Sequence, residues 1–259
     1  MENSLVLYQV NNRVAEITLN RPEKRNALNP ALVEALKSAF KKAKEDENAK
    51  IVVLKANGEV FSAGADLAYM QQLQGFSYEE NIKDSNALKE LFETIRTLPK
   101  VVIAQVEGHA IAGGCGLATI CDIIFTVPEA KFGYTEVKLG FVPAIVSCYL
   151  MQKVGETLTK KLLLSGELFT AQEALHYNLI TYVTKATEMP LMVNNFALNL
   201  CNSASGNSLA LTKQLINNTS NTWLDSCLTE AVKTNARTRE GDDFKKGIAA
   251  FLAKEKINW

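Results

Sequence analysis

Short apolar runs predict the strands in the first half of the chain. Leu5–Val10 and Val14–Leu19 are rich in residues that favour β-structure, and they flank Asn11-Asn12, a pair typical of a hairpin turn. Continuous apolar runs are typical of strands that are buried on both faces. Three segments have this pattern: Ile51–Lys55, Val101–Val106 and Ile123–Val127.

Helical periodicity alternates with these strands and dominates the last third of the chain. Asn29-Pro30 has the composition of an N-cap followed by a first-turn proline. Apolar residues then recur at helical spacing, at Leu32, Leu36, Phe40 and Ala43. Later helical patterns occur at Val193–Leu200, Trp223–Arg237 and Phe244–Lys256. The alternation predicts an α/β core domain at residues 1–195 and a helical region at residues 196–259.

Composition narrows the range of functions. The formal net charge is +0, so the chain has no global field that would attract nucleic acid or an anionic membrane. The most apolar stretch, Ala110–Val127, contains Asp122 and several glycines, which argues against a membrane span. The first ten residues lack the basic start and the long apolar run of a signal peptide. We therefore expect a cytoplasmic protein with no nucleic-acid or membrane partner.

The cysteines and histidines do not form a metal-binding pattern. The five cysteines include no CxxC pair and lie mostly among apolar residues, which predicts buried, reduced thiols. The two histidines, His109 and His176, lack nearby carboxylates at the spacing of metal ligands. We expect no metal and no prosthetic group.

Gly108–Gly116 is the first segment with candidate chemistry. It follows a predicted strand and opens a predicted helix. Its small residues allow a ligand to approach the backbone, and free N–H groups at a helix start can stabilise an oxyanion on a carbonyl. It has neither the GxGxxG spacing of a dinucleotide site nor the GK[ST] of a P-loop. The alternative is a tight turn packed against a neighbouring element.

Two further segments are candidates. Phe61–Leu67 is another Gly/Ala-rich turn after a strand, and it is either a source of a second N–H donor or an ordinary turn. Phe132–Gly140 contains Glu136 among mostly apolar residues, which would raise the pKa of its carboxyl towards acid/base use. The alternative for Glu136 is a surface position paired with Lys138.

Together, these motifs resemble the enoyl-CoA hydratase/isomerase (crotonase) family. The resemblance is carried by RPEKRNAL at 21–28, FSAGADL at 61–67, GHAIAGGCGLATICD at 108–122, FGYTEVKLGFVPA at 132–144 and REGDDFKKGIAAFLAKEKINW at 239–259. It implies a spiral of ββα units followed by a helical trimerisation region, in a homotrimer or a dimer of trimers. It also implies an acyl-CoA thioester as the substrate, activated by an oxyanion hole without a further cofactor.

Site residues follow from the same resemblance. Ala65 and Gly113 match the two backbone donors of the oxyanion hole, and Glu136 matches a catalytic glutamate. Other matching positions border CoA: Ala63, Asp66 and Leu67 on the adenine side, Lys24 and Arg25 at the mouth, and Phe251 and Lys254 on the C-terminal tail. Two tyrosines near these segments, Tyr69 and Tyr134, are candidates either for contact with the acyl group or for core positions.

Gly116 departs from the family pattern. It borders the expected substrate and stands where hydratases of the family have their first catalytic glutamate, so one carboxylate remains. One carboxylate suffices to move a proton between carbons, which favours a Δ3,Δ2-enoyl-CoA isomerase. The run EVKLGFVPAIVS, which begins at Glu136, instead resembles bacterial methylglutaconyl-CoA hydratases of leucine breakdown.

We therefore expect hydration of an α,β-unsaturated acyl-CoA, with 3-methylglutaconyl-CoA as the specific substrate. Glu136 would act as the single general acid and base, and the substrate's own carboxylate would help to position the water. The isomerase is the first alternative. A non-catalytic acyl-CoA-binding protein is the second.

Overall fold

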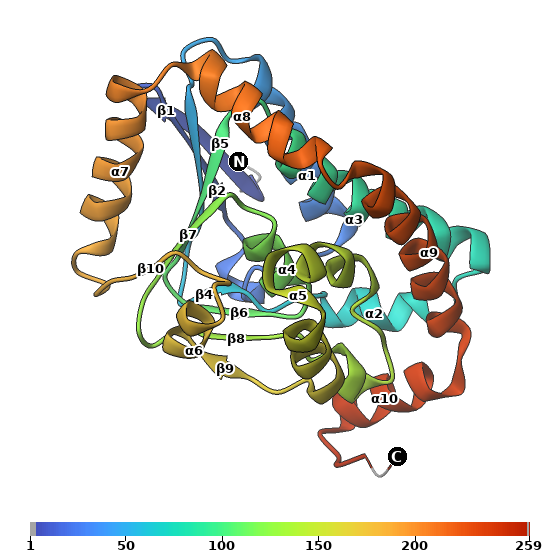
Figure 1. Cartoon of the computed structure of the whole chain (residues 1–259). Helices are drawn as coiled ribbons and strands as arrows, with labels where there is room; N and C mark the ends of the chain where they lie inside the picture. The colour runs from blue at the N-terminus through green and yellow to red at the C-terminus, as the bar shows by residue number, and fades with distance from the viewer. Residues whose placement is uncertain (1–3, 258) are drawn as a thin grey trace.

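The fold consists of two β-sheets surrounded by helices (Figure 1). It is described from a computed structural model, which covers residues 4–257 and 259. The larger sheet has the strand order β1 (Val6–Asn11), β2 (Val14–Leu19), β3 (Ile51–Ala56), β5 (Val101–Val106), β7 (Ile123–Thr126) and β10 (Tyr182–Val183). The smaller sheet has the order β4 (Val60–Ser62), β6 (His109–Ile111), β8 (Lys131–Gly133) and β9 (Phe169–Thr170).

Three successive strand pairs produce a spiral. In each pair the first strand joins the larger sheet and the second joins the smaller one: β3 with β4, β5 with β6, and β7 with β8. A helical segment follows each pair, namely α2 (Leu67–Leu73) with α3 (Tyr78–Thr97), α4 (Gly113–Thr119), and the 3₁₀ turn η2 (Glu136–Leu139) with α5 (Ala144–Ser165). The predicted α/β class and the ββα units are confirmed.

The first helix, α1 (Pro30–Glu45), begins at the predicted cap. The Leu32 backbone N–H donates to Asn29 Oδ1 at 2.9 Å, and the predicted apolar face is buried. Helix α1 packs against β1 and β2, whereas α7 (Met189–Ser203) covers the other side of the larger sheet (Figure 1). The expected boundary between residues 195 and 196 falls inside α7, so the division into two regions stays a prediction.

The hairpin at the N-terminus is confirmed, but its turn lies one residue later than predicted. Asn11 still pairs with Val14 in the antiparallel ladder of β1 and β2. The turn residues are Asn12 and Arg13, with φ of 49° and 67°. A two-residue turn of this type needs positive φ at both central positions, which fixes the register at this pair.

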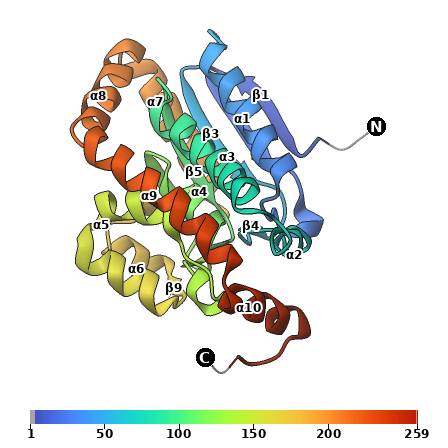
Figure 2. The same cartoon turned by 90° about the vertical axis from the view of Figure 1, so that its right-hand side faces the viewer.

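The remaining helices form the C-terminal part. After the short α6 (Ala171–His176) and α7 come α8 (Gly206–Asn218), α9 (Asn221–Glu240) and α10 (Asp242–Ala253). Helix α9 lies along α3 and α5, and α10 folds back next to η2 (Figure 2). None of the helices in the described part of the chain combines the length and the apolar character needed to cross a bilayer.

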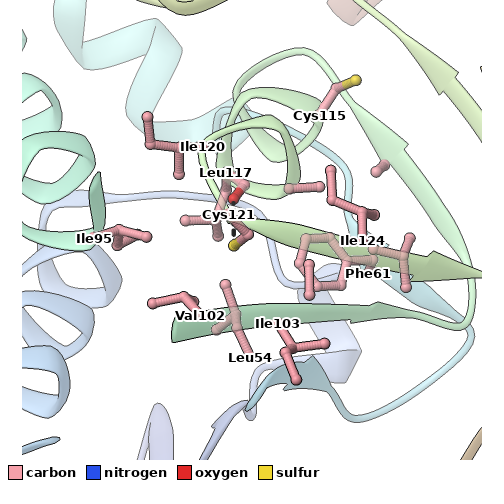
Figure 3. Close-up of a cluster of buried hydrophobic side chains, with 14 of the residues drawn as sticks. Leu54, Phe61, Ile95, Val102, Ile103, Cys115, Leu117, Ile120, Cys121 and Ile124 are labelled. Carbon is pink, nitrogen blue, oxygen red and sulfur yellow. Dashed lines mark hydrogen bonds between the residues drawn. The ribbon is translucent and has the colours of Figure 1, made fainter. Parts of the chain in front are cut away.

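The main core lies where both sheets meet the helices. Figure 3 shows side chains from α3, α4 and the strands of the larger sheet in one buried cluster, including Ile95, Leu117 and Ile103. Cys115 and Cys121 belong to this core, and Cys201 is also a buried free thiol. The continuous apolar strands therefore form the centre of the molecule, as their pattern predicted.

Two cysteines contradict the expectation of reduced thiols. Cys148 on α5 and Cys227 on α9 form a disulfide, with their Cα atoms 5.9 Å apart. They are separated by 79 residues in the sequence. The pairing arises because α9 returns to pack along α5, a contact that no local pattern encodes.

A single buried asparagine holds the segment between β2 and α1. Asn26 Oδ1 accepts from the Arg21 backbone N–H, and Asn26 Nδ2 donates to the carbonyls of Asn57 and Val60, each at 2.9 Å. Asn26 has a φ of 51°, a conformation that asparagine tolerates better than most residues. These bonds fix the segment against β4, directly before the Phe61–Leu67 turn.

Replacing Asn26 with alanine should destabilise the protein by about 1–3 kcal/mol, because three hydrogen bonds in a partly buried segment are lost. Urea unfolding followed by circular dichroism measures the change. The matched control is Asn207→Ala at an exposed position of α8, where we expect a change below about 0.5 kcal/mol. Equal unfolding midpoints for wild type and Asn26→Ala would show that other groups replace these bonds.

Candidate active site

One cavity of about 670 Å³ brings the three candidate segments together. Ala63 and Ala65 line it from the turn after β4, Gly113 lines it from the start of α4, and Glu136 lines it from the start of η2. Most of the remaining lining is apolar and comes from α1, α2, α3 and the loop before α5. Segments that are far apart in the sequence therefore form a single site.

The N–H of Ala65 is left free by the way its turn is held. The Leu28 backbone N–H donates to the Gly64 carbonyl at 2.7 Å, and the Asp66 N–H donates to the Leu28 carbonyl at 2.8 Å. This parallel bridge between Leu28 and Ala65 uses the neighbours of Ala65 and turns its own N–H to the other side. Within the described residues, the Ala65 N–H has no acceptor.

The N–H of Gly113 is free for a different reason. Gly113 is the first residue of α4, and the first N–H groups of a helix have no partner within it. The preceding residue, Ala112, has φ 51° and ψ −126°, an uncommon conformation for a residue with a side chain. The Ala112 N–H donates to the Gly133 carbonyl at 2.7 Å, which anchors this sharp change from β6 to α4.

These two turns touch at Gly64. A Cβ atom at Gly64 would lie 2.9 Å from the Ala112 Cβ, 3.0 Å from the Ile111 carbonyl oxygen and 3.6 Å from the Gly113 nitrogen. Gly64 also has a φ of +87°, which favours glycine. Only a residue without a side chain allows this approach, which places the N–H groups of Ala65 and Gly113 on adjacent turns.

Glu136 is a buried carboxyl without a balancing charge. Its side chain is 8% exposed, and Oε2 has no hydrogen-bond partner in the described part of the chain. Burial raises the pKa of Glu136 to about 7, although its own backbone N–H opposes the shift. Lys138 is exposed, whereas Glu136 is buried and its Oε2 has no partner among the described residues, so the surface alternative for Glu136 is wrong.

This arrangement can perform one kind of chemistry well. Two N–H donors from adjacent turns can bind a carbonyl oxygen and stabilise the negative charge that develops on it. A carboxyl with a pKa of about 7 can take up and release a proton at neutral pH. The site is therefore suited to proton transfer next to a carbonyl or thioester.

Gly116 lies behind the cavity wall, in the buried part of α4. A Cβ atom there would come within 3.1 Å of Phe92 Cζ and 3.3 Å of Val146 Cγ2. Both neighbours line the cavity. A side chain at this position would therefore press against apolar side chains from α3 and α5.

The two candidate tyrosines have different positions. Tyr134 is fully buried, and its hydroxyl is 2.7 Å from Thr119 Oγ1, so it is a core residue. Tyr69 lines the cavity and donates a hydrogen bond from its hydroxyl to Asp84. The structure therefore favours only Tyr69 for contact with a ligand.

Among the expected CoA-binding residues, Ala63 and Phe251 line the cavity. Asp66 has a local role, because it pairs with Arg21 at 2.6 Å and caps α2 by accepting from the Tyr69 N–H. The others are exposed: Lys24 and Arg25 at η1 (Pro22–Lys24), Leu67 at the start of α2, and Lys254 at the end of α10. Contact of these residues with CoA stays a prediction.

Sequence reasoning missed several polar residues around the cavity. Asp84, Asn235 and Arg239 line it from α3 and α9. Lys153 on α5 donates to the Thr119 and Cys121 carbonyls at the end of α4, 2.8 Å from the latter, and so holds the helix that carries Gly113. Arg239 opens the C-terminal motif at 239–259, but no local pattern indicated the positions of these side chains, because they depend on how helices distant in the sequence pack together.

The next feature is the arrangement of possible metal ligands among the side chains that the structure describes. No group of three or more His, Cys, Asp or Glu side chains among them is placed to hold an ion. His109 is exposed at the start of β6, and its Nδ1 accepts from the Lys131 N–H at 3.1 Å. His176 is exposed at the end of α6.

Comparisons with known proteins agree with this chemistry. Residues 9–259 match the family model described as enoyl-CoA hydratase/isomerase. A Thermus thermophilus protein, provisionally named an enoyl-CoA hydratase, is 40% identical over 93% of this chain and 95% of its own length. The Escherichia coli 2,3-dehydroadipyl-CoA hydratase is 32% identical over 93% of each chain. The Syntrophomonas wolfei crotonyl-CoA hydratase is 30% identical over 98% of this chain and 97% of its own length.

Solved structures match over nearly the whole chain. An enoyl-CoA hydratase from Mycobacterium avium is similar with a TM-score of 0.88 and 31% identity, covering 99% of both chains. An enoyl-CoA hydratase/isomerase from Xanthobacter autotrophicus gives a TM-score of 0.90 at 26% identity, covering 96% of this chain and 93% of its own.

The raised pKa of Glu136 has a consequence for stability. The ordinary pKa of a glutamate is near 4.5, and burial raises it to about 7 in the folded protein. The folded state therefore binds an extra proton between these two pH values. The stabilisation from the neutral carboxyl is fully present below about pH 4.5 and is lost as the pH rises through about 7.

Glu136→Gln should therefore stabilise the protein in a pH-dependent way, because glutamine stays neutral. We expect a gain of roughly 2–3 kcal/mol over wild type at pH 8 and little difference near pH 4. Urea unfolding of both proteins at the two pH values measures this. A stability difference that does not change with pH would contradict a raised pKa.

Proposed function

Because the chain belongs to the enoyl-CoA hydratase/isomerase family, we propose that it adds water across the α,β double bond of an enoyl-CoA thioester. The supporting observation is the buried carboxyl of Glu136 in one cavity with two free backbone N–H groups. The N–H groups of Ala65 and Gly113 bind the thioester oxygen. They stabilise the enolate more strongly than the ground state, which lowers the barrier.

Glu136 performs both proton transfers. Its ionised carboxyl removes a proton from water while the water oxygen bonds to the β-carbon, and the electrons of the double bond move to the thioester as an enolate. Glu136 then returns that proton to the α-carbon on the same face, so water is added syn. A pKa of about 7 suits both roles, since neither protonation state is strongly favoured at neutral pH.

The specific substrate that we propose is 3-methylglutaconyl-CoA, an intermediate of leucine breakdown. The motif after Glu136 supports this choice, as does Gly116, which supplies no second carboxylate and is closely surrounded by Phe92 and Val146. The substrate's own carboxylate then helps to position the water. The names of the relatives do not identify the acyl group of the substrate, because they include both a 2,3-dehydroadipyl-CoA hydratase and a crotonyl-CoA hydratase.

A Δ3,Δ2-enoyl-CoA isomerase is the second candidate. A single carboxylate can move a proton between two carbons, and Gly116 leaves Glu136 as the one carboxylate matching the family pattern. The oxyanion donors would serve the same enolate. A non-catalytic binder is disfavoured, because both donors and the carboxyl have the geometry for chemistry.

The proposed enzyme acts in the cytoplasm as a homotrimer or a dimer of trimers. The C-terminal helices support self-association, since they expose large apolar side chains, including Leu191, Leu211, Leu215, Ile216 and Trp223. Burial of such side chains against another subunit would remove them from water. Trimer and hexamer are both compatible with this surface.

Glu136→Gln should retain CoA-thioester binding and lose nearly all turnover, on the order of 10³-fold or more, because shape is kept while proton transfer is lost. Turnover is measured with 3-methylglutaconyl-CoA, crotonyl-CoA and a 3-enoyl-CoA, with products identified by mass. Binding of butyryl-CoA is measured by calorimetry. Glu129→Gln, at an exposed position, is the matched control.

Unchanged turnover in Glu136→Gln would overturn the mechanism. A gain of water on the wild-type product supports hydration, whereas double-bond migration without a mass change assigns the isomerase reaction. Hydration of crotonyl-CoA at the same kcat/KM as 3-methylglutaconyl-CoA would contradict the proposed substrate.

Gly116→Glu should not produce a better hydratase. The new side chain meets Phe92 and Val146, and its carboxylate would be buried near another ionisable carboxyl. We expect lower thermal stability and no gain in kcat/KM for crotonyl-CoA. Gly116→Gln separates the steric effect from the charge effect. A clear gain in crotonyl-CoA hydration by Gly116→Glu alone would show that the site merely lacks its second carboxylate.

A further inference from the structure

A second polar group lies in the cavity, away from the oxyanion turns in the sequence. Asp84 on α3 and Asn235 and Arg239 on α9 line the same cavity as Glu136. Helices α3 and α9 run side by side in both views (Figures 1 and 2). Arg239 is 5% exposed and Asn235 is 4% exposed. Burying such groups in a largely apolar cavity is costly unless their hydrogen-bonding atoms find partners.

One edge of the Arg239 guanidinium is firmly held. Its Nη1 donates to Asp84 Oδ2 at 2.6 Å and to Asn81 Oδ1 at 3.2 Å. The other carboxylate oxygen of Asp84 accepts from the Tyr69 hydroxyl. The guanidinium also lies over the Phe141 ring, 5.4 Å from its centroid. These contacts fix the orientation of the group before any ligand binds.

The other edge of the guanidinium has no partner. The hydrogen bonds and the ion pair of Arg239 within the described residues all go through Nη1, and Nε is buried without an acceptor. The N–H groups of Nε and Nη2 point in parallel, which is the geometry that binds both oxygens of a carboxylate. Asn235 lies one helical turn earlier, and because its buried, unpaired Oδ1 can only accept, the atom of Asn235 that can donate to a carboxylate is Nδ2.

Other charges of the lining do not replace this group. Glu34, Lys138 and Glu255 also line the cavity, but all three are exposed and so remain hydrated. Within the lining that the structure describes, Arg239 is the buried cation. Its charge is already balanced by Asp84, so what it offers a ligand is the pair of N–H donors on its free edge.

We propose that the free edge of Arg239, assisted by Asn235, binds a carboxylate carried by the acyl group, and so selects dicarboxylic acyl-CoA thioesters. This rests on the proposed function insofar as the acyl group must enter the same cavity. A simple acyl chain leaves the buried Arg239 Nε–H unpaired, which penalises its binding. A site built to hydrogen-bond a polar group rejects analogues that lack it far more strongly than an apolar pocket rejects an added group.

The test compares recognition with and without turnover. Glutaryl-CoA and butyryl-CoA are saturated, so their binding to wild type by calorimetry reports recognition alone. Hydration of 3-methylglutaconyl-CoA and of 3-methylcrotonyl-CoA, which lacks the second carboxylate, reports recognition during the reaction. The variants are Arg239→Gln, Arg239→Lys and Asn235→Ala, and Arg237→Gln, an exposed position on the same helix, is the matched control.

We expect wild type to bind glutaryl-CoA at least about 30-fold more tightly than butyryl-CoA. Arg239→Gln should lose on the order of 10²-fold in affinity for glutaryl-CoA and in kcat/KM for the diacid substrate, with less than about threefold change for the monoacids. Arg239→Lys should recover only part of this, because a lysine keeps the charge without the parallel pair of donors. Arg237→Gln should change neither.

The outcomes separate this inference from the proposed reaction. Equal losses for diacid and monoacid ligands in Arg239→Gln would show that Arg239 only clamps α3 to α9, and would overturn the inference. So would wild-type affinities that do not distinguish glutaryl-CoA from butyryl-CoA. Arg239-dependent binding of glutaryl-CoA without any hydration would overturn the reaction and leave the recognition intact. If Arg239→Gln does not fold, Asn235→Ala and Arg239→Lys provide the same comparison.

Discussion

The contact between two turns at Gly64 is the constraint on which the rest of the site depends. The turn after β4 and the turn before α4 approach so closely that a single added Cβ would collide with Ala112. The strand pairing that forms the spiral brings the two turns together, and the bridge to Leu28 holds one of them from behind. The free N–H groups of Ala65 and Gly113 are a consequence of that packing, because neither turn provides a hydrogen-bond acceptor for them.

Several features of this site destabilise the folded protein, and they lie on different elements of the fold. Ala112 has an uncommon backbone conformation, Glu136 is buried without a cation, and Arg239 keeps an unpaired Nε. Strain and unpaired polar groups of this kind persist only where the surroundings over-determine them. Here the surroundings are the continuous core strands, the Asn26 hydrogen bonds and Lys153 at the end of α4. Elements outside the cavity thus offset the destabilisation that the unpaired and strained groups in the cavity cause.

Strands, helices and caps that depend on a local sequence pattern could be predicted from the sequence. Strands such as Val101–Val106 and the cap at Asn29 are encoded within a few residues, and both were found. Strands of two or three residues, such as β4 and β9, are too short for any periodicity, so the second sheet was missed as such. The oxyanion segments and Glu136 came from linked motifs. Arg239 opens the C-terminal motif at 239–259, but its position in the cavity could not be predicted, because it is 155 residues from its partner Asp84. The pairing of Cys148 with Cys227 has the same origin.

Gly116 and Arg239 both affect the balance of charge in the cavity. A second catalytic glutamate and a dicarboxylic ligand would add two acidic groups to a mostly apolar cavity that already contains Glu136 and Asp84, and each added charge would raise the desolvation cost and the mutual repulsion. Glycine at position 116 removes one of these charges, and Phe92 and Val146 fill the space. Arg239 presents an unpaired guanidinium edge in the same cavity. The missing carboxylate and the buried arginine therefore both favour a ligand that brings its own negative charge, and the missing carboxylate alone would not distinguish that ligand from the substrate of an isomerase.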